Sequence, residues 1–194
     1  MAAQSSIFPA QIRIAVSACL LGERVRYDGE EKTHPLIIKL AHEFALQPFC
    51  PEVAIDLGVP RASLQLVTTS SGIRARGVTD PEHDISDRLR AYAQLQCEAL
   101  KSCAGVILKS RSPSCGLGSS PLFNEQGGQT GKTSGLFAAV VRDCLPNLPM
   151  VEESALMTEA ELEAFARQVR DYDALSPGSL SPAGEGRSGR NNQA

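Results

Sequence analysis

Long apolar runs are absent from this chain of 194 residues, and none approaches the roughly 18 residues that span a bilayer. The first residues, MAAQSSIFPAQ, lack the charged and apolar regions of a signal peptide. Basic residues are not in excess either, because 19 Lys and Arg face 22 Asp and Glu, for a formal net charge of −3. We therefore expect a cytoplasmic protein whose partners include neither a membrane nor a nucleic-acid polymer, since nucleic-acid phosphates are bound through a basic surface.

Local CxxC pairs, which mark zinc ribbons and simple ferredoxins, are also absent, although the chain has six cysteines. The three histidines, His34, His42 and His83, form no ligand motif, which argues against a zinc site. In a cytoplasmic chain, cysteines are better explained by metal binding, catalysis or packing than by disulfides. The role of each cysteine therefore depends on its place in the fold.

Strand patterns alternate with helix patterns along most of the chain. Strands are expected within residues 11–19, 47–53, 105–110 and 149–153, and a strand pair within 61–79. Helices are expected within 35–46, 84–103, 134–145 and 158–173, with Asp84 or Ser86 as the cap of the second and a Thr158–Glu161 capping box on the last. This alternation predicts a Rossmann-like α/β domain, a mostly parallel sheet with helices on both faces.

Two segments in the second half of the chain, the last residues and GGQTGKTS, do not follow this alternation of strands and helices. From about residue 176 the chain is rich in Ser, Gly and Pro, so we expect a single folded domain over 1–175 and a disordered tail over 176–194. The segment GGQTGKTS resembles a phosphate-binding P-loop, but the first glycine of that motif would fall at Gln126, and SSPLFNEQ before it is a poor buried strand. A polar loop that caps the next helix is expected instead of a nucleotide site.

Cys19, Cys50 and Cys115 each lie where a predicted strand ends. The carboxyl ends of parallel strands meet at one edge of a sheet, so the three thiols are expected to converge there. Three thiolates without a fourth ligand would leave one iron of a [4Fe-4S] cluster open as a Lewis acid. The residues alone leave a second interpretation, in which the three cysteines pack as small hydrophobic side chains.

The other three cysteines, Cys97, Cys103 and Cys144, fall within predicted helices or at the end of one. We interpret them as core or neutral positions, because free cysteine is often simply buried.

Polar residues in the same loops are candidates for acid and base chemistry. Glu52 follows Cys50 by two positions, where it could shuttle a proton or be a surface glutamate. Ser112 and Ser114 flank Pro113 and could bond a substrate or cluster sulfide, or could satisfy their own turn.

Four further residues are candidates for substrate or charge interactions. Asp28 could orient a substrate or make an Asp-Gly turn, and Arg61 could bind substrate. Lys109 and Arg111, like Arg61, could offset cluster or substrate charge or be solvated surface residues.

Several segments resemble a family of small proteins, long described as a domain of unknown function and linked to thiouracil desulfurase. They are SACLLGERVRYDG, CPEVAIDLGVPR, LKSRSPSCG, TGKTSGLFA and PMVEE, and together they span about residues 12–153. The order SACLLG, CPE, SPSCG is a specific combination. One departure is Gly77, where family members often carry aspartate.

The resemblance implies a [4Fe-4S] cluster held by Cys19, Cys50 and Cys115, with the fourth iron free. It also implies an iron-sulfur-dependent desulfurase of sulfur metabolism: the free iron captures the thiocarbonyl sulfur of a thiolated pyrimidine such as 2-thiouracil, water adds at that carbon, and uracil and hydrogen sulfide form without net redox change. Glu52 is then the expected acid and base, and Ser112 or Ser114 the positioning group. The alternatives are a metal-free sulfurtransferase that carries a persulfide on Cys115 and a non-enzymatic iron-sulfur sensor.

Overall fold

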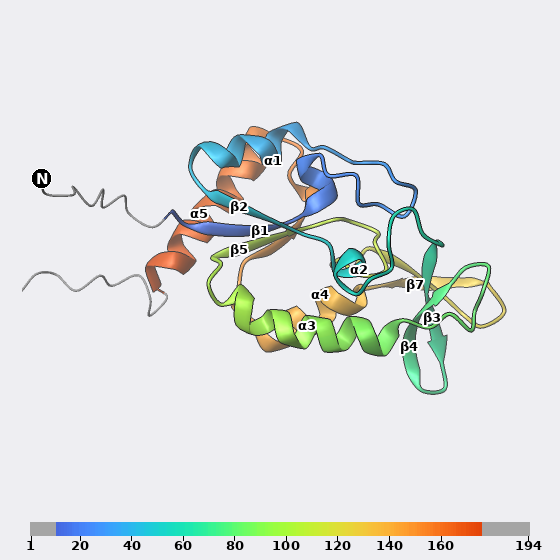
Figure 1. Ribbon diagram of the computed structural model, residues 1–194. Coiled ribbons are helices and arrows are strands. Elements are labelled where there is room, and N and C mark those ends of the chain that lie inside the picture. The colour runs from blue at the N-terminus through green and yellow to red at the C-terminus, as the bar shows by residue number, and fades with distance from the viewer. Residues whose placement is uncertain (1–10, 176–194) are drawn as a thin grey trace, which may run out of the picture.

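A parallel sheet forms the centre of the computed structural model, which describes residues 11–175 (Figure 1). Strands β1 (Arg13–Ser17), β2 (Ala45–Phe49), β5 (Gly105–Leu108) and β8 (Met150–Glu152) pair in the order β2-β1-β5-β8, every pair parallel. The predicted tail over 176–194 lies outside the described residues. No helix within residues 11–175 is long and apolar enough to cross a membrane.

Helices cover both faces of this sheet. Along β1, Ile14 and Val16 pack into one buried cluster, together with residues of α1 (Pro35–Lys39) and α5 (Glu159–Leu175). Ala15 points the other way, into a cluster with residues of α3 (Ser86–Leu100) and α4 (Leu136–Cys144). Figure 1 shows these two helical layers on opposite sides of the sheet. The three-layer α/β prediction is confirmed, because alternate strand residues face opposite layers.

A second sheet of four strands lies beyond the carboxyl ends of the first. It has the order β4-β3-β6-β7, with β3 (Leu64–Thr69), β4 (Gly72–Gly77), β6 (Ser120–Phe123) and β7 (Gln129–Thr133). The predicted strand pair is the antiparallel β3–β4 hairpin. The predicted polar loop is wrong, because β6 and β7 occupy it; β7 is an exposed edge strand, so its sequence shows no apolar alternation.

The short elements and helix ends depart from the prediction in detail. Short helices η1 (Ala18–Leu21), η2 (Leu40–His42), α2 (Pro51–Ala54) and η3 (Glu153–Ala155) complete the fold. The helix that begins at Pro35 ends at Lys39 instead of 46, because the chain from Ala45 pairs with β1. Ile85 occupies the cap position of α3, in place of Asp84 or Ser86. The capping box of α5 is confirmed, with Thr158 and Glu161 each accepting the other's backbone N–H.

Cys97 and Cys144 form a disulfide that joins α3 to α4, with their Cα atoms 6.4 Å apart. The expectation that both are free thiols is therefore wrong, although Cys97 is buried in the core as predicted. The two cysteines are 47 residues apart in sequence, and only the packing of α3 on α4 brings them together. Cys103 is a free, buried thiol as expected, with 3% of its surface exposed.

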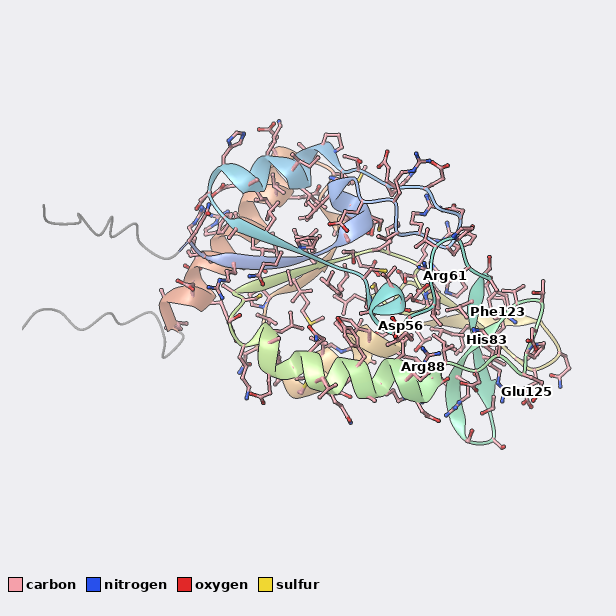
Figure 2. The ribbon with its side chains drawn as sticks, viewed as in Figure 1. Asp56, Arg61, His83, Arg88, Phe123 and Glu125 are labelled. Carbon is pink, nitrogen blue, oxygen red and sulfur yellow. A yellow bond between two sulfur atoms is a disulfide. The ribbon has the colours of Figure 1, made fainter. Side chains whose placement is uncertain are left out.

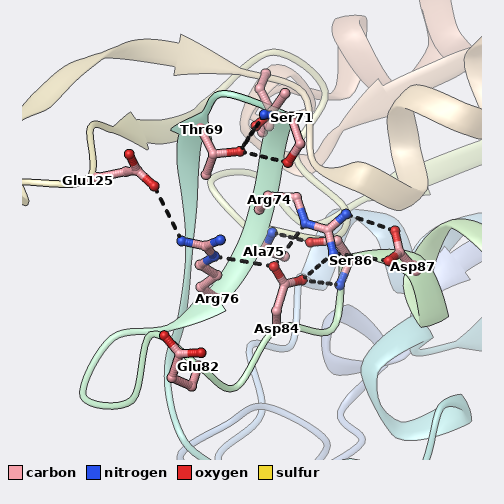
Figure 3. Close-up of polar contacts among 12 residues, drawn as sticks. Thr69, Ser71, Arg74, Ala75, Arg76, Glu82, Asp84, Ser86, Asp87 and Glu125 are labelled. Atoms are coloured by element: carbon pink, nitrogen blue, oxygen red, sulfur yellow. Dashed lines mark hydrogen bonds and ion pairs between the residues drawn. The ribbon is translucent and has the colours of Figure 1, made fainter.

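An ion-pair network fixes β4 to the start of α3 (Figure 3). Arg74 donates to Asp84 (Nε to Oδ2, 2.8 Å) and to Asp87 (Nη1 to Oδ1, 2.9 Å). Arg76 donates to the same Oδ2 of Asp84 (3.2 Å) and lies 3.7 Å from Glu125. Asp84 is thus the shared acceptor of two arginines.

The Asp84 carboxylate is expected to stabilise the fold in a pH-dependent way. Burial alone would raise its pKa, but hydrogen bonds from Arg74 and Ser86 outweigh burial and hold the pKa well below the usual range. A depressed folded-state pKa gives stability that is complete above the unfolded pKa of about 3.9 and is lost as the pH falls below it. Urea unfolding should show Asp84→Asn less stable by about 1–2 kcal/mol at pH 7, allowing for solvent screening, with the difference shrinking below about pH 4. A difference that stays constant down to pH 3 would contradict this assignment.

Candidate functional site

A cavity of about 550 Å³ opens where β1, β2 and β5 end. Ser17 at the end of β1, Phe49 at the end of β2 and Lys109 just after β5 all line it. Cys19, Cys50 and Cys115 line the same cavity. The parallel topology thus brings the three predicted cysteines together at one edge of the sheet.

The three thiols are free, largely buried and close enough to affect one another's charge. Cys19 and Cys115 are 7% and 5% exposed, and Cys50 is half-buried. Burial, with the neighbouring Cys50 as the next cause, raises the pKa of Cys19 to about 11. Burial, with Cys50 as the next cause, raises the pKa of Cys115 well above its usual value. Three thiolates in this space repel one another, so a bound metal cation would stabilise their charged form.

The arrangement does not match a mononuclear metal site. Within residues 11–175, no three His, Cys, Asp or Glu side chains could hold a single metal ion. Cys19, Cys50 and Cys115 nevertheless line one cavity, and three cysteine thiolates suit a polynuclear cluster, in which each cysteine binds a different metal atom. The donor chemistry is therefore that of an iron-sulfur cluster.

Local structure explains how Cys19 and Cys50 are presented. Cys19 lies in η1, directly after β1, and its carbonyl accepts the N–H of Lys32 at 2.8 Å. Cys50 occupies the cap position of α2 with extended backbone angles (φ −138°, ψ 109°). Pro51 favours this conformation, because proline disfavours a helical residue before it.

Cys115 is presented by a tight turn. The Ser112 hydroxyl accepts the N–H groups of Ser114 (3.2 Å) and Cys115 (3.1 Å), and its carbonyl accepts that of Gly116 (2.9 Å). Ser112 thus accepts the backbone N–H groups of its own turn, which was one of its two predicted roles. It also lines the cavity. The first N–H groups of α4 continue this pattern, with Leu136 donating to the Pro113 carbonyl at 3.0 Å.

Gly135 allows α4 to approach this turn. A Cβ atom at Gly135 would lie 2.5 Å from the Ser114 carbonyl oxygen, closer than real Cβ contacts. Gly135→Ala is therefore expected to push the turn away, to destabilise the fold by about 1–3 kcal/mol through overpacking, and to impair metal binding at Cys115. Urea unfolding and iron content after anaerobic reconstitution measure the two effects.

Gly131→Ala is the matched control, because a Cβ atom at Gly131 in β7 meets no atom within 4 Å. This variant should bind as much iron as the wild type. Equal behaviour of the two variants would show that the contact of α4 with the turn does not position Cys115.

Glu52 is fixed from both sides beside the cysteines. Its carboxyl group is buried, with Ser114 Oγ donating to Oε1 (2.7 Å) and Arg61 Nε donating to Oε2 (2.8 Å). Arg61 also donates to the Gly58 carbonyl at 3.0 Å. Arg61, predicted as a substrate residue, thus has its Nε committed to Glu52 while its side chain still lines the cavity. Ser114, Glu52 and Arg61 form one network.

The structure places Asp28 in a turn outside the residues that line the cavity. Its carboxylate pairs with Arg26 at 2.7 Å and accepts the N–H of Glu30 at 3.1 Å, as an aspartate does in an Asx turn. Asp28 therefore makes a turn, as the second of its two predicted roles required. It contacts the cavity lining through Arg26.

Most of the charged side chains that line the cavity are basic. Among the described residues that line it, Glu52 is the one carboxylate. Five basic side chains line it: Arg26, Lys32, Arg61, Lys109 and Arg111. Sequence reasoning missed Arg26 and Lys32. Their position within and just after the SACLLGERVRYDG segment is the signal that could have found them.

The model of the 2-thiouracil desulfurase family matches residues 14–153, which include both sheets except Arg13, and all three cavity cysteines. The chain belongs to the 2-thiouracil desulfurase family. Among its relatives, the uncharacterized protein YbbK of Bacillus subtilis (strain 168) is 31% identical over 138 residues. The match covers 66% of this chain and 89% of YbbK. Among solved structures, the [4Fe-4S]-dependent thiouracil desulfidase TudS has 28% identity and a TM-score of 0.63, over 81% of this chain and 99% of its own.

The local structure explains why Gly77 stands at the position where the resemblance led us to expect aspartate. A Cβ atom there would lie 2.5 Å from the Asp80 carbonyl oxygen, and the Gly77 N–H donates to the His83 carbonyl at 3.0 Å. A side chain at this position would require the loop to move. Gly77 lines a second cavity of about 420 Å³, which shares Arg61 with the first; Figure 2 labels its residues Asp56, Arg61, His83 and Arg88.

Proposed function

We propose that this protein removes sulfur from a thiolated pyrimidine such as 2-thiouracil, by a hydrolysis that gives uracil and hydrogen sulfide without net redox change. The observation that carries the proposal is the cavity itself, whose lining holds three free cysteines together with Glu52, while the buried Ser114 hydroxyl donates to the Glu52 carboxylate from behind the lining. Membership of the 2-thiouracil desulfurase family and the likeness to TudS support it.

Cys19, Cys50 and Cys115 would hold a [4Fe-4S] cluster in this cavity. Among the described residues that line it there is no fourth cysteine and no histidine, so one iron would lack such a ligand. A cluster with an open iron supplies a Lewis acid that binds the substrate sulfur. The basic side chains of the lining would offset the negative charge of the thiolates and of the cluster's sulfides.

Glu52 is the proposed acid and base. The overall reaction exchanges one C=S for one C=O: water adds its oxygen to the thiocarbonyl carbon, and its two protons leave with the sulfur as hydrogen sulfide. Glu52 would accept a proton from the attacking water and deliver it to the departing sulfur. Ser114 and Arg61 position both carboxylate oxygens for this transfer.

Phe49 offers a flat apolar surface for the pyrimidine ring. It lines the cavity next to Cys50, and its ring packs against Phe137 of α4 with centroids 5.3 Å apart. A ring fixed in this way can orient a planar heterocycle and exclude water from its face.

The structure favours this proposal over the metal-free persulfide mechanism. A sulfurtransferase needs an activated thiolate with a lowered pKa. Burial, followed by the effect of Cys50, changes the pKa of Cys115 in the opposite direction. Membership of the 2-thiouracil desulfurase family supports an enzyme over a non-enzymatic sensor.

Anaerobic reconstitution with iron and sulfide, followed by incubation with 2-thiouracil, tests the function. Uracil and hydrogen sulfide are expected in equal amounts, and chelated, iron-free protein should form neither. Equal turnover by the iron-free protein would contradict the role of the cluster. A loaded protein that releases no sulfide from 2-thiouracil or a thionucleoside would contradict the desulfuration.

A further inference from the structure

Two consecutive glutamates, Glu152 and Glu153, lie beside the loop that carries Cys115. Glu152 ends β8 and is paired with Leu108, the last residue of β5, from which that loop begins. Parallel pairing of β8 with β5 therefore brings both carboxyl groups to the two arms of the loop over residues 109–119. Neither glutamate lines the cavity, and neither has a role in the function proposed above.

Glu153 binds the first arm of the loop. Its carboxylate accepts the Ser110 hydroxyl (2.7 Å) and the Ser110 N–H (2.5 Å) and pairs with the Lys109 ammonium. Only 8% of Glu153 is exposed. Burial would raise its pKa, but the hydrogen bonds from Lys109 and Ser110 outweigh it and lower the pKa, so the group remains a carboxylate.

Glu152 binds the second arm. Its Oε1 accepts the Leu117 N–H at 2.5 Å and also the Ser119 hydroxyl. The Ser119 hydroxyl oxygen in turn accepts the N–H of Arg111 at 2.7 Å, which ties the second arm back to the first. Ser114 and Cys115 lie between the two bound arms.

We propose that Glu152 and Glu153 are positioning residues that hold the loop over residues 109–119 and so keep Cys115 at the cavity and the Ser114 hydroxyl on Glu52. A carboxylate suits this task because it accepts several charge-assisted hydrogen bonds from backbone and side chains at once. Glu153 also fixes Lys109, which lines the cavity next to Cys19. The inference rests on the proposed function for its purpose, but the loop restraint can be measured without the cluster.

The variants Glu152→Gln and Glu153→Gln test the restraint in the metal-free protein. The Gln side chain keeps the shape of Glu. Its NH₂ group is itself a donor, so it cannot accept the hydrogen bonds that the replaced carboxylate oxygen accepts. Amide hydrogen exchange is read at Cys115 and Gly116, whose N–H groups donate to Ser112 within the turn and not to either glutamate. Exchange there should become about tenfold faster or more, because it reports local opening of the loop.

Asp84→Asn is the matched control, since Asp84 also binds backbone and arginine donors but lies at the second sheet. It should lower overall stability in urea without a selective change at Cys115 and Gly116. Exchange at these amides that stays at the wild-type rate in both glutamate variants, or rises only as much as in Asp84→Asn, would overturn the proposal.

Iron retention gives the second readout. Loaded Glu152→Gln and Glu153→Gln proteins should lose iron to a chelator about tenfold faster than Asp84→Asn or the wild type. If the wild type binds no iron, the proposed function fails while the exchange result still decides the restraint. If the wild type binds iron and the exchange is unchanged, the restraint fails alone.

Discussion

Replacing Cys19, Cys50 or Cys115 by alanine is expected to abolish bound iron and sulfide release together. Each of the three supplies one of the thiols at the cavity, and with two thiolates remaining, a second iron would lack its protein ligand. Iron and sulfide content after anaerobic reconstitution, the visible absorption spectrum and hydrogen sulfide release from 2-thiouracil measure the effect. The expected loss of activity is complete for each single variant.

Cys103→Ala is the control for this series. Cys103 is a free, buried thiol like the other three, but it lies outside the cavity lining and its sulfur contacts the Gln47 side-chain oxygen at 3.5 Å. Its removal should leave iron content and turnover at the wild-type level. A Cys103→Ala protein without iron, or a Cys115→Ala protein that keeps its full complement, would contradict the assignment of the ligands.

Glu52→Gln is expected to lower the turnover number by about 10²–10⁴-fold while the protein keeps its iron, the range typical of a lost general acid or base. The amide can still accept from Ser114, but it cannot take up and return a proton. Steady-state kinetics on preparations with measured iron content separate this loss of chemistry from a loss of the cluster. A Gln variant with wild-type turnover would exclude Glu52 as the proton carrier.

The control for this substitution is Glu125→Gln. Glu125 is an exposed carboxylate that lies near Arg76 in the second sheet, well outside the cavity lining (Figure 3). The turnover number of the Glu125→Gln variant should match that of the wild type. An equal drop in both variants would show that the effect of Glu52→Gln is a general one.

The sequence was informative where local pattern and topology act together. Cys19 and Cys50 directly follow β1 and β2, and parallel pairing brings such positions to one edge, whereas Cys115 lies further along the loop after β5 and is placed by its turn. The strand expected within 47–53 includes Cys50, and Cys50 has extended backbone angles. The approach of Cys19 and Cys50 to one edge could therefore be predicted without knowledge of any side-chain contact, and that of Cys115 only from the direction of β5.

Other features depend on long-range packing that no local pattern reports. The partner of Arg61 is Glu52, and that contact depends on the path of the chain between them. The Cys97–Cys144 disulfide depends on α3 packing against α4. Strands β6 and β7 are held by their pairing with β3 and with each other, so their polar residues resemble a loop in sequence.

The most direct test of the central claim is a crystal structure of the anaerobically reconstituted protein, with anomalous diffraction recorded at the iron absorption edge. We expect four irons in the cavity, three bonded to the sulfurs of Cys19, Cys50 and Cys115, and one without a protein ligand. Iron bound elsewhere, or a fourth protein side chain on the remaining iron, would contradict the account.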